Sequence, residues 1–207
     1  SQHGANRLGA NSLLSAAYGG FAAGPSIVEY VQGLDSTYES VDEATVKDAL
    51  ARDRAEYEGI LKLDGPVNPY VLHEELGALM TENVTIVREN AKLAATYEKL
   101  FDIAERYQHI GIDDRSTWSN LTAPFVRQLG GMIDLAKVIT LGALNRNESR
   151  GSHYKPEFPD RNDEEWLKTT MASYDAAADA PVLSYEPVDV SLIKPRKRDY
   201  TKTKKEA

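Results

Sequence analysis

The chain contains no cysteine among its 207 residues, and no apolar run in it approaches the length of a membrane-spanning helix. Without thiols it can form neither disulfide bonds nor thiolate metal sites, which fits a reducing compartment. A helix needs roughly 20 predominantly apolar residues to span a bilayer. We therefore expect any link to a membrane to pass through other subunits.

Basic residues are in the minority. The chain has 24 Lys and Arg against 32 Asp and Glu, which gives a net charge of −8 and a pI near 5.1. This balance argues against nucleic acid as a general partner. The hydrophobic share of 42% and the charged share of 27% are ordinary for a globular protein. A chain of this length can bury a core in one or two domains.

A dinucleotide-binding fingerprint is also missing. No Gly-x-Gly-x-x-Gly follows a predicted strand, so nothing here is expected to bind a dinucleotide cofactor. The sequence opens with Ser1, with no initiator methionine and no signal peptide. We therefore expect part of a longer subunit, which is not active as an enzyme by itself.

The most informative segment is residues 3–14, HGANRLGANSLL, where Arg7 and two glycines come just before a predicted helix. Arg7 offers a planar fork of donors that fits a carboxylate, and glycines let the backbone approach a bound molecule closely. On chemistry alone, a structural ion pair is the commoner role for such an arginine.

The predicted helix that follows covers residues 12–31. Asn11 and Ser12 are good N-cap residues, residues 13–23 are apolar enough for a buried helix, and Pro25 is expected to kink or divide it. A helix N-terminus presents unpaired N–H groups and a partial positive charge, which suit an anion or an electron-rich ring. The whole segment favours a site that holds a carboxylate beside such a ring.

The middle of the chain carries two further helix-start signals. Ser40 and Glu43 form a Ser-x-x-Glu capping box, and Asn68 is an N-cap followed by proline at the first helical position. Apolar residues at helical spacing predict further long helices over residues 90–109 and 122–147. Amphipathic helices joined by short polar links predict an antiparallel three-helix bundle.

The last quarter has a different character, because five prolines break up any long helix. Short runs over residues 169–174 and 182–190 favour β structure, with a hairpin turn around 176–181. The tail, residues 194–205, is basic within an acidic chain. Such tails are usually solvated and mobile, although this one could instead touch anionic lipid or a partner. We interpret Trp118 and Trp166 as packing anchors.

Two motifs resemble one family in particular. Residues 3–14 are similar to the substrate-arginine and flavin-contact motif of succinate dehydrogenase and fumarate reductase flavoprotein subunits. Residues 146–153, RNESRGSH, and 158–167, FPDRNDEEWL, are similar to a block near the end of these subunits, which commonly has Ala where Ser152 stands. The resemblance spans nearly the whole chain but only the family's C-terminal part.

The resemblance implies roles for particular residues. Arg7 would bind a carboxylate of succinate or fumarate beside the flavin and favour the charge that develops during hydride transfer. Ser12 and Leu13 match positions whose backbone meets the flavin ring, and Asn11 is a weaker candidate for the same contact. Neither a catalytic residue nor a metal ligand is assigned here, because the flavin-linking histidine and the proton-shuttling arginine lie upstream in this family.

Glu148, Ser149, Arg150 and His153 form a polar cluster after the last long helix. A catalytic interpretation, with His153 as base and Ser149 as nucleophile, is disfavoured because neither an elbow motif nor a third orienting residue is evident. We expect Arg150 and Glu148 instead to tie the bundle to the flavin domain or to an adjoining subunit.

The resulting expectation is a mainly α fold: a flavin-contacting helix, an antiparallel three-helix bundle and a small irregular α+β C-terminal region. The expected domains are residues 1–35, the end of an FAD-binding domain; 36–150, the helical bundle; and 151–207, the C-terminal region with its basic tail. The resemblance implies FAD-dependent oxidation of succinate to fumarate, with electrons passed to an iron–sulfur subunit and quinone. It also implies a peripheral position on the cytoplasmic side of the membrane, reached through a membrane-anchor subunit.

Three alternatives stay open. The same residues serve a fumarate reductase, which works in the opposite direction. Aspartate oxidase shares the fold but typically has a different pair where this chain has Gly9 and Ala10. A non-catalytic helical interaction module would explain why the bundle lacks a catalytic constellation of its own.

Overall fold

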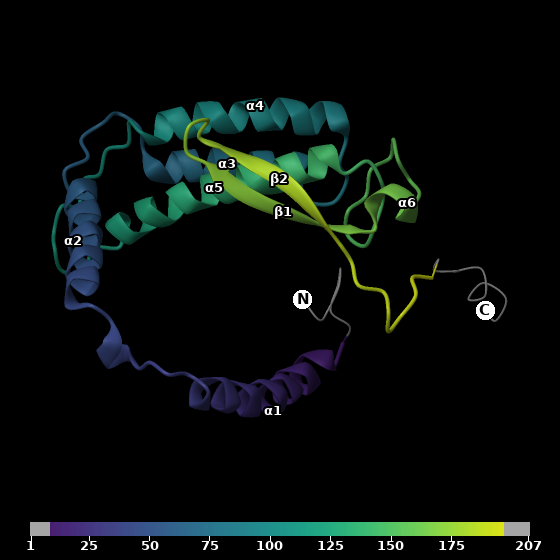
Figure 1. The fold of residues 1–207 in the computed structure, drawn as a ribbon. Helices are drawn as coiled ribbons and strands as arrows, with labels where there is room; N and C mark the ends of the chain where they lie inside the picture. The colour runs from purple at the N-terminus through teal and green to yellow at the C-terminus, as the bar shows by residue number, and fades with distance from the viewer. Residues whose placement is uncertain (1–8, 197–207) are drawn as a thin grey trace. The chain divides into compact units, whose positions relative to one another are not determined.

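The computed structural model describes residues 9–196 and is mainly helical, as the sequence predicts (Figure 1). The chain forms two compact units, of which the first ends at Arg161 and the second begins at Asn162. The elements follow in this order: α1 (Asn11–Gln32), the 3₁₀ turn η1 (Tyr38–Ser40), α2 (Glu43–Ile60), α3 (Pro69–Asn83), α4 (Asn90–Tyr107), α5 (Thr122–Asn145), α6 (Asp163–Trp166), β1 (Lys168–Asp175) and β2 (Ala180–Pro187).

The core of the first unit lies between α3, α4 and α5, which pack together (Figure 1). Each helix contributes leucines or isoleucines at helical spacing, so a single apolar stripe faces the shared core. α2 reaches this core only through its C-terminal end, where Ile60 is buried and Tyr57 is half-buried. The fully or nearly buried aliphatic side chains include Leu72, Leu76, Leu100, Ile103, Val126, Leu129 and Ile133.

Local capping chemistry determines where α2 and α3 begin. The Asn68 side chain accepts hydrogen bonds from the amides of Tyr70 and Val71, which confirms the predicted start of α3 at Pro69. The predicted capping box before α2 is wrong. Asp42, not Ser40, is the N-cap, and its carboxylate accepts from the amide of Ala44. Ser40 instead closes η1 by donating to the Thr37 carbonyl.

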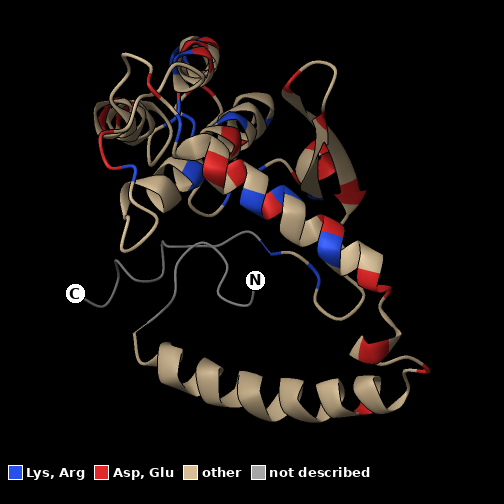
Figure 2. Cartoon of the chain, turned by 90° about the vertical axis from the view of Figure 1, so that its left-hand side faces the viewer, with Lys and Arg blue, Asp and Glu red and all other residues tan. Residues whose placement is uncertain are grey.

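α1 is one continuous helix of 22 residues, although Pro25 lies inside it. The predicted caps are also wrong here. Asn11 and Ser12 are already helical, and the N-cap is Ala10, whose φ of 62° is in the left-handed region. None of its residues is buried, so the burial expected for residues 13–23 is not found in the described part of the chain. Figure 2 shows that α1 is almost free of charge whereas α2 carries many charged residues.

The second unit contains the predicted hairpin. β1 and β2 pair antiparallel in a register that joins Thr170 to Tyr185 and Ala172 to Leu183, and β2 ends at Pro187, short of the predicted residue 190. Trp166 packs edge-on against Tyr185, with ring centroids 5.7 Å apart, and is therefore the packing anchor that we expected. Trp118 is not an anchor in this structure, because 85% of it is exposed. Within the described residues, no helix is both long enough and apolar enough to cross a membrane.

Candidate functional site

The start of α1 carries the predicted flavin contacts. Asn11, Ser12 and Leu13 form its first turn, whereas Arg7 lies outside the described residues. The first amides of a helix have no carbonyl acceptor within the helix, and the alanine that precedes them has no side-chain acceptor to offer. Ser12 and Leu13 are exposed, and Asn11 is half-buried. Backbone donors are thus available at this end of the helix.

The sequence predicts that this turn meets the edge of a flavin ring, whose carbonyl oxygens and nitrogens accept hydrogen bonds. The first turn of α1 contains no acidic residue, so nothing in it opposes the partial positive charge of the helix start. Two apolar side chains also lie here, because Leu13 belongs to the turn, Leu14 follows it, and they are 83% and 69% exposed. The turn can therefore donate hydrogen bonds and offer an apolar surface to a planar ring.

A buried ionic cluster lies beyond the C-terminus of α5, in the segment of residues 146–158. Its centre is Glu148, whose side chain has no exposed surface. Arg150 binds both carboxylate oxygens, with distances of 2.8 Å from Nε and 2.9 Å from Nη2, and Arg146 Nη1 lies 2.7 Å from Oε1. A carboxylate buried this completely needs such partners, because an unpaired charge would be very costly.

Lys155 ties this segment to the end of α5. Its ammonium group donates to the carbonyl oxygen of Leu144 at 2.8 Å and to Oδ1 of Asn147 at 3.1 Å. The last carbonyls of a helix lack intrahelical donors, so this side chain acts as a C-terminal cap. Burial lowers the pKa of Lys155 to about 8, with a smaller lowering from Arg88 and an opposing effect of Glu157.

His153 connects the same segment to the loop between α3 and α4. Its Nδ1 lies 2.6 Å from Nη1 of Arg88, and its Nε2 lies 2.9 Å from the carbonyl oxygen of Arg146. Since a guanidinium can only donate, Nδ1 must accept and Nε2 must carry the proton. The pKa of His153 is lowered, mainly by burial and also by the nearby cations Arg88, Lys155 and Arg146, although the bond to the Arg146 carbonyl opposes this.

Ser149 has none of the surroundings of a nucleophile. Its hydroxyl donates to the carbonyl oxygen of Phe158 at 2.7 Å and accepts from the amide of Lys155 at 2.9 Å. The two ring nitrogens of His153 meet Arg88 and Arg146 instead. The geometry is therefore that of a structural network. The expected tie from Arg150 and Glu148 to another domain or subunit stays a prediction.

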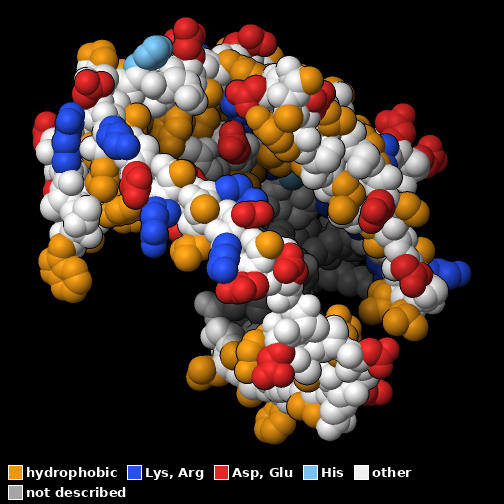
Figure 3. Space-filling model, turned by 60° about the vertical axis from the view of Figure 1, so that its left-hand side comes forward, with side chains coloured by type: hydrophobic (Ala, Val, Ile, Leu, Met, Phe, Trp, Pro, Cys, Tyr) orange, Lys and Arg blue, Asp and Glu red, His pale blue; other side chains and the backbone are white. Residues whose placement is uncertain are grey.

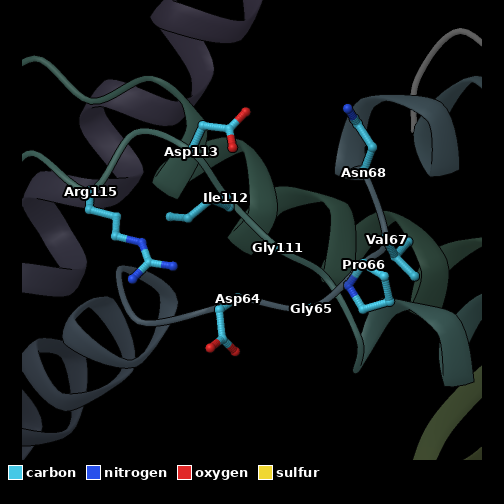
Figure 4. A pocket seen from close by; sticks show the side chains of 9 residues that line it. All are labelled: Asp64, Gly65, Pro66, Val67, Asn68, Gly111, Ile112, Asp113 and Arg115. Atoms are coloured by element: carbon cyan, nitrogen blue, oxygen red, sulfur yellow. The ribbon is translucent and has the colours of Figure 1, made fainter.

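One pocket was not expected from the sequence. It has a volume of about 270 Å³ and lies between the loop before α3 and the loop after α4. Figure 4 shows the carboxylates of Asp64 and Asp113 pointing apart, with Arg115 on a third side. Groups that point apart do not converge on one substrate atom, so we assign no catalytic role to them. The only signal in the sequence was the Gly65–Pro66 turn.

Solved structures share this fold. The quinol fumarate reductase FrdA from E. coli superposes with a TM-score of 0.71 at 28% identity, over 76% of this chain and 27% of that chain. Mycobacterium smegmatis Sdh1, solved in complex with UQ1, superposes with a TM-score of 0.58 at 24% identity, over 78% of this chain and 26% of its own. The second likeness is one of fold alone. The architecture is thus one that both solved structures contain as about a quarter of their own length.

The family follows from the sequence match. The family model described as "Fumarate reductase flavoprotein C-term" matches residues 73–200, which is more than half of the chain. The chain therefore belongs to the family of succinate dehydrogenase and fumarate reductase flavoprotein C-terminal regions.

Two curated relatives give the scale of this similarity. The succinate dehydrogenase flavoprotein subunit of Bacillus subtilis is 54% identical over 204 residues, which cover 99% of this chain and 35% of that protein. The fumarate reductase flavoprotein subunit of Haemophilus influenzae is 33% identical over 198 residues, which cover 96% of this chain and 32% of that protein. The chain thus spans about a third of the length of these relatives.

Proposed function

We propose that this chain is the C-terminal part of a succinate dehydrogenase flavoprotein subunit. The full subunit oxidises succinate to fumarate with FAD, and electrons pass through an iron–sulfur subunit to quinone. The observation that carries this proposal is the 54% identity to a succinate dehydrogenase subunit, against 33% for a fumarate reductase subunit. The assembled enzyme is peripheral, on the cytoplasmic side of the membrane, and held there through a membrane-anchor subunit.

Arg7 binds a carboxylate of the substrate in this proposal. Succinate gives up a hydride and a proton as it becomes fumarate, and bound FAD supplies the acceptor for the hydride. A guanidinium can hold both oxygens of one carboxylate, which fixes the substrate carbon in place. The proton acceptor lies in the upstream part of the subunit, so no residue of this chain takes that role.

The first turn of α1 holds the flavin. The amides of Ser12 and Leu13, with Asn11 as a weaker candidate, donate to the ring and favour its electron-rich reduced form. The exposure of α1 supports this assignment. Eight large apolar side chains of this helix are more than half exposed, namely those of Leu13, Leu14, Tyr18, Phe21, Ile27, Val28, Tyr30 and Val31.

Those apolar side chains point in several directions around the helix axis. A helix that is apolar all round is normally enclosed in a larger domain. Residues 1–35 therefore form the end of an FAD-binding domain, whereas the bundle that follows is the separate helical domain. Figure 3 shows hydrophobic side chains reaching the surface between the charged ones on one face of the molecule.

The test is Arg7→Lys in the intact flavoprotein assembled with its partner subunits. Lysine keeps the charge but loses the fork, so kcat/KM for succinate should fall on the order of 100-fold. Arg52→Lys is the matched control, since Arg52 is exposed on α2 and should leave kcat/KM unchanged. Near-normal succinate oxidation by Arg7→Lys would contradict the proposal that Arg7 binds a carboxylate of the substrate.

A second measurement separates the alternatives. Succinate oxidation and fumarate reduction are both assayed with quinones of different potential. Faster oxidation with a high-potential quinone supports the dehydrogenase, whereas faster fumarate reduction with a low-potential quinol identifies a fumarate reductase. If the intact polypeptide retains no FAD and shows neither activity, the helical interaction module is the better description.

A further inference from the structure

α5 has a second apolar face that the bundle does not cover. Its buried positions, which include Val126, Leu129, Ile133, Ala136 and Ala143, face α3 and α4. Met132, Leu135 and Ile139 follow one another at spacings of three and four residues, so they share another side of the helix. They are 37%, 61% and 47% exposed. We call these three residues the α5 outer stripe.

The surroundings of the α5 outer stripe are uncharged, with exposed Gln128 one turn before Met132. Gly131 and Gly142 border it, and a β-carbon added at either glycine would meet nothing within 4 Å. Of the charged residues in α5, Lys137 is buried and Arg127 binds Asp53 and Glu56 of α2. Helical periodicity places Asp134 well away from the stripe as well. Another backbone can therefore approach this side of α5 closely.

An apolar stripe without charges is typical of a permanent interface rather than a transient one. Obligate interfaces resemble a domain core cut in half, whereas transient interfaces are about as polar as the rest of the surface. The other outward faces of the bundle differ from the stripe. α4, for example, carries the ion pair between Arg106 and Asp102, and its Lys92 pairs with Glu89, the residue before the helix.

We propose that the α5 outer stripe is covered by the upstream part of the same polypeptide. This inference rests on the proposed function. The relatives match 96–99% of this chain with only 32–35% of their own length, so about two thirds of a full subunit lies outside it. A tethered domain also has a high effective concentration at the bundle, which favours an intramolecular contact over a separate partner.

The absence of cysteine from this chain makes a direct test possible. Leu135→Cys and Ile139→Cys are made separately in the full-length flavoprotein, and the rate of maleimide labelling is measured before and after denaturation. Ala94→Cys, at an exposed position of α4, is the matched control. Labelling of the unmodified flavoprotein gives the background from any upstream cysteines. The rates are measured with and without the partner subunits, and at two protein concentrations.

The expected result is at least tenfold slower labelling at positions 135 and 139 than at position 94 in the flavoprotein without partner subunits. Protection that appears only after the iron–sulfur subunit is added would overturn the proposal in favour of that subunit. Protection that grows with protein concentration would identify a second copy as the occupant and also overturn it. Fast labelling at positions 135 and 139 in every state would show that the α5 outer stripe is a free surface, and this too would overturn the proposal. None of these rates depends on succinate oxidation, so the proposed function and this inference can fail separately.

Discussion

Gly111 lies against Gly65 so closely that a β-carbon on Gly111 would overlap the Gly65 carbonyl oxygen far inside van der Waals contact. The two loops that carry these glycines are joined by backbone hydrogen bonds, among them Gly65 N to Ile110 O at 3.2 Å and Gly111 N to Val67 O at 3.0 Å. This crossing fixes the entry to α3 beside the exit from α4, and it forms one wall of the pocket. Only glycine allows the two backbones to approach this closely.

Gly111→Ala should therefore destabilise the fold. The methyl group cannot be accommodated by a side-chain shift, because the atom that it meets is backbone, so we expect a loss of about 3 kcal/mol. Gly77→Ala is the matched control, since an added β-carbon there meets nothing within 4 Å. Gly77 lies inside α3, where alanine should instead stabilise by about 0.5–1 kcal/mol. Urea unfolding measures the change in the free energy of unfolding of each variant, and the two changes should have opposite signs. An unchanged free energy of unfolding in Gly111→Ala would contradict the close contact between the two loops.

Lys155 should make stability depend on pH in the alkaline range. Its pKa is about 8 in the folded protein, against the ordinary value of 10.5. Between these values the unfolded chain keeps a proton that the folded protein has released, so the free energy of unfolding should rise with pH. Lys155→Met removes this contribution. The stability of the wild type relative to the variant should rise by at most about 3 kcal/mol from pH 8 to 10.5. Urea unfolding across this range is the measurement, and a constant difference would contradict the lowered pKa.

His153 should make stability fall on acidification. Its folded pKa is below the ordinary 6.5, so below that pH the unfolded chain takes up a proton before the folded protein does. A proton on Nδ1 would also face the guanidinium of Arg88 at hydrogen-bond distance. The wild type should therefore lose more stability between pH 7 and 5 than His153→Asn, whose side-chain oxygen can still accept from Arg88.

The same geometry makes a spectroscopic prediction. The ¹⁵N–¹H correlations of the His153 ring should show the proton on Nε2 at pH 7, because Nδ1 accepts from Arg88. Arg88→Met should raise the His153 pKa, since it removes one of the cations that lower it. A proton on Nδ1, or an unchanged pKa in Arg88→Met, would be incompatible with this arrangement.

Features that depend on neighbours in sequence were predictable. The start of α3 follows from Asn68 and the proline after it, and the hairpin follows from two short β-leaning runs. The start of α2 was missed although it is local, because Ser40 and Asp42 both have suitable side chains and only the backbone decides which one caps. Trp118 was misplaced because its size was taken as evidence of burial.

Features that depend on contacts between distant segments could not be predicted from the sequence. Arg88 meets His153 across 65 positions of sequence, and Gly65 meets Gly111 across 46 positions. No spacing rule connects such residues, since the helices between them bring them together. The cluster around Glu148 was recognised as polar, but its burial depends on how the segment after α5 folds back. The assignments of Arg7, Asn11, Ser12 and Leu13 stay predictions, because the contacts proposed for them involve a substrate and a flavin and not other described residues.

Glu148→Gln tests whether the buried cluster holds this segment in place. The amide keeps the shape of the side chain but removes the charge that Arg146 and Arg150 share, and both guanidinium groups are largely buried. Removing one partner of a buried ion pair leaves the others unpaired, so the loss should be about 3 kcal/mol. Glu98→Gln on the exposed side of α4 is the matched control and should stay within about 0.5 kcal/mol of the wild type. Urea unfolding supplies both values. If Glu148→Gln were as mild as Glu98→Gln, the cluster could not be what fixes the segment after α5.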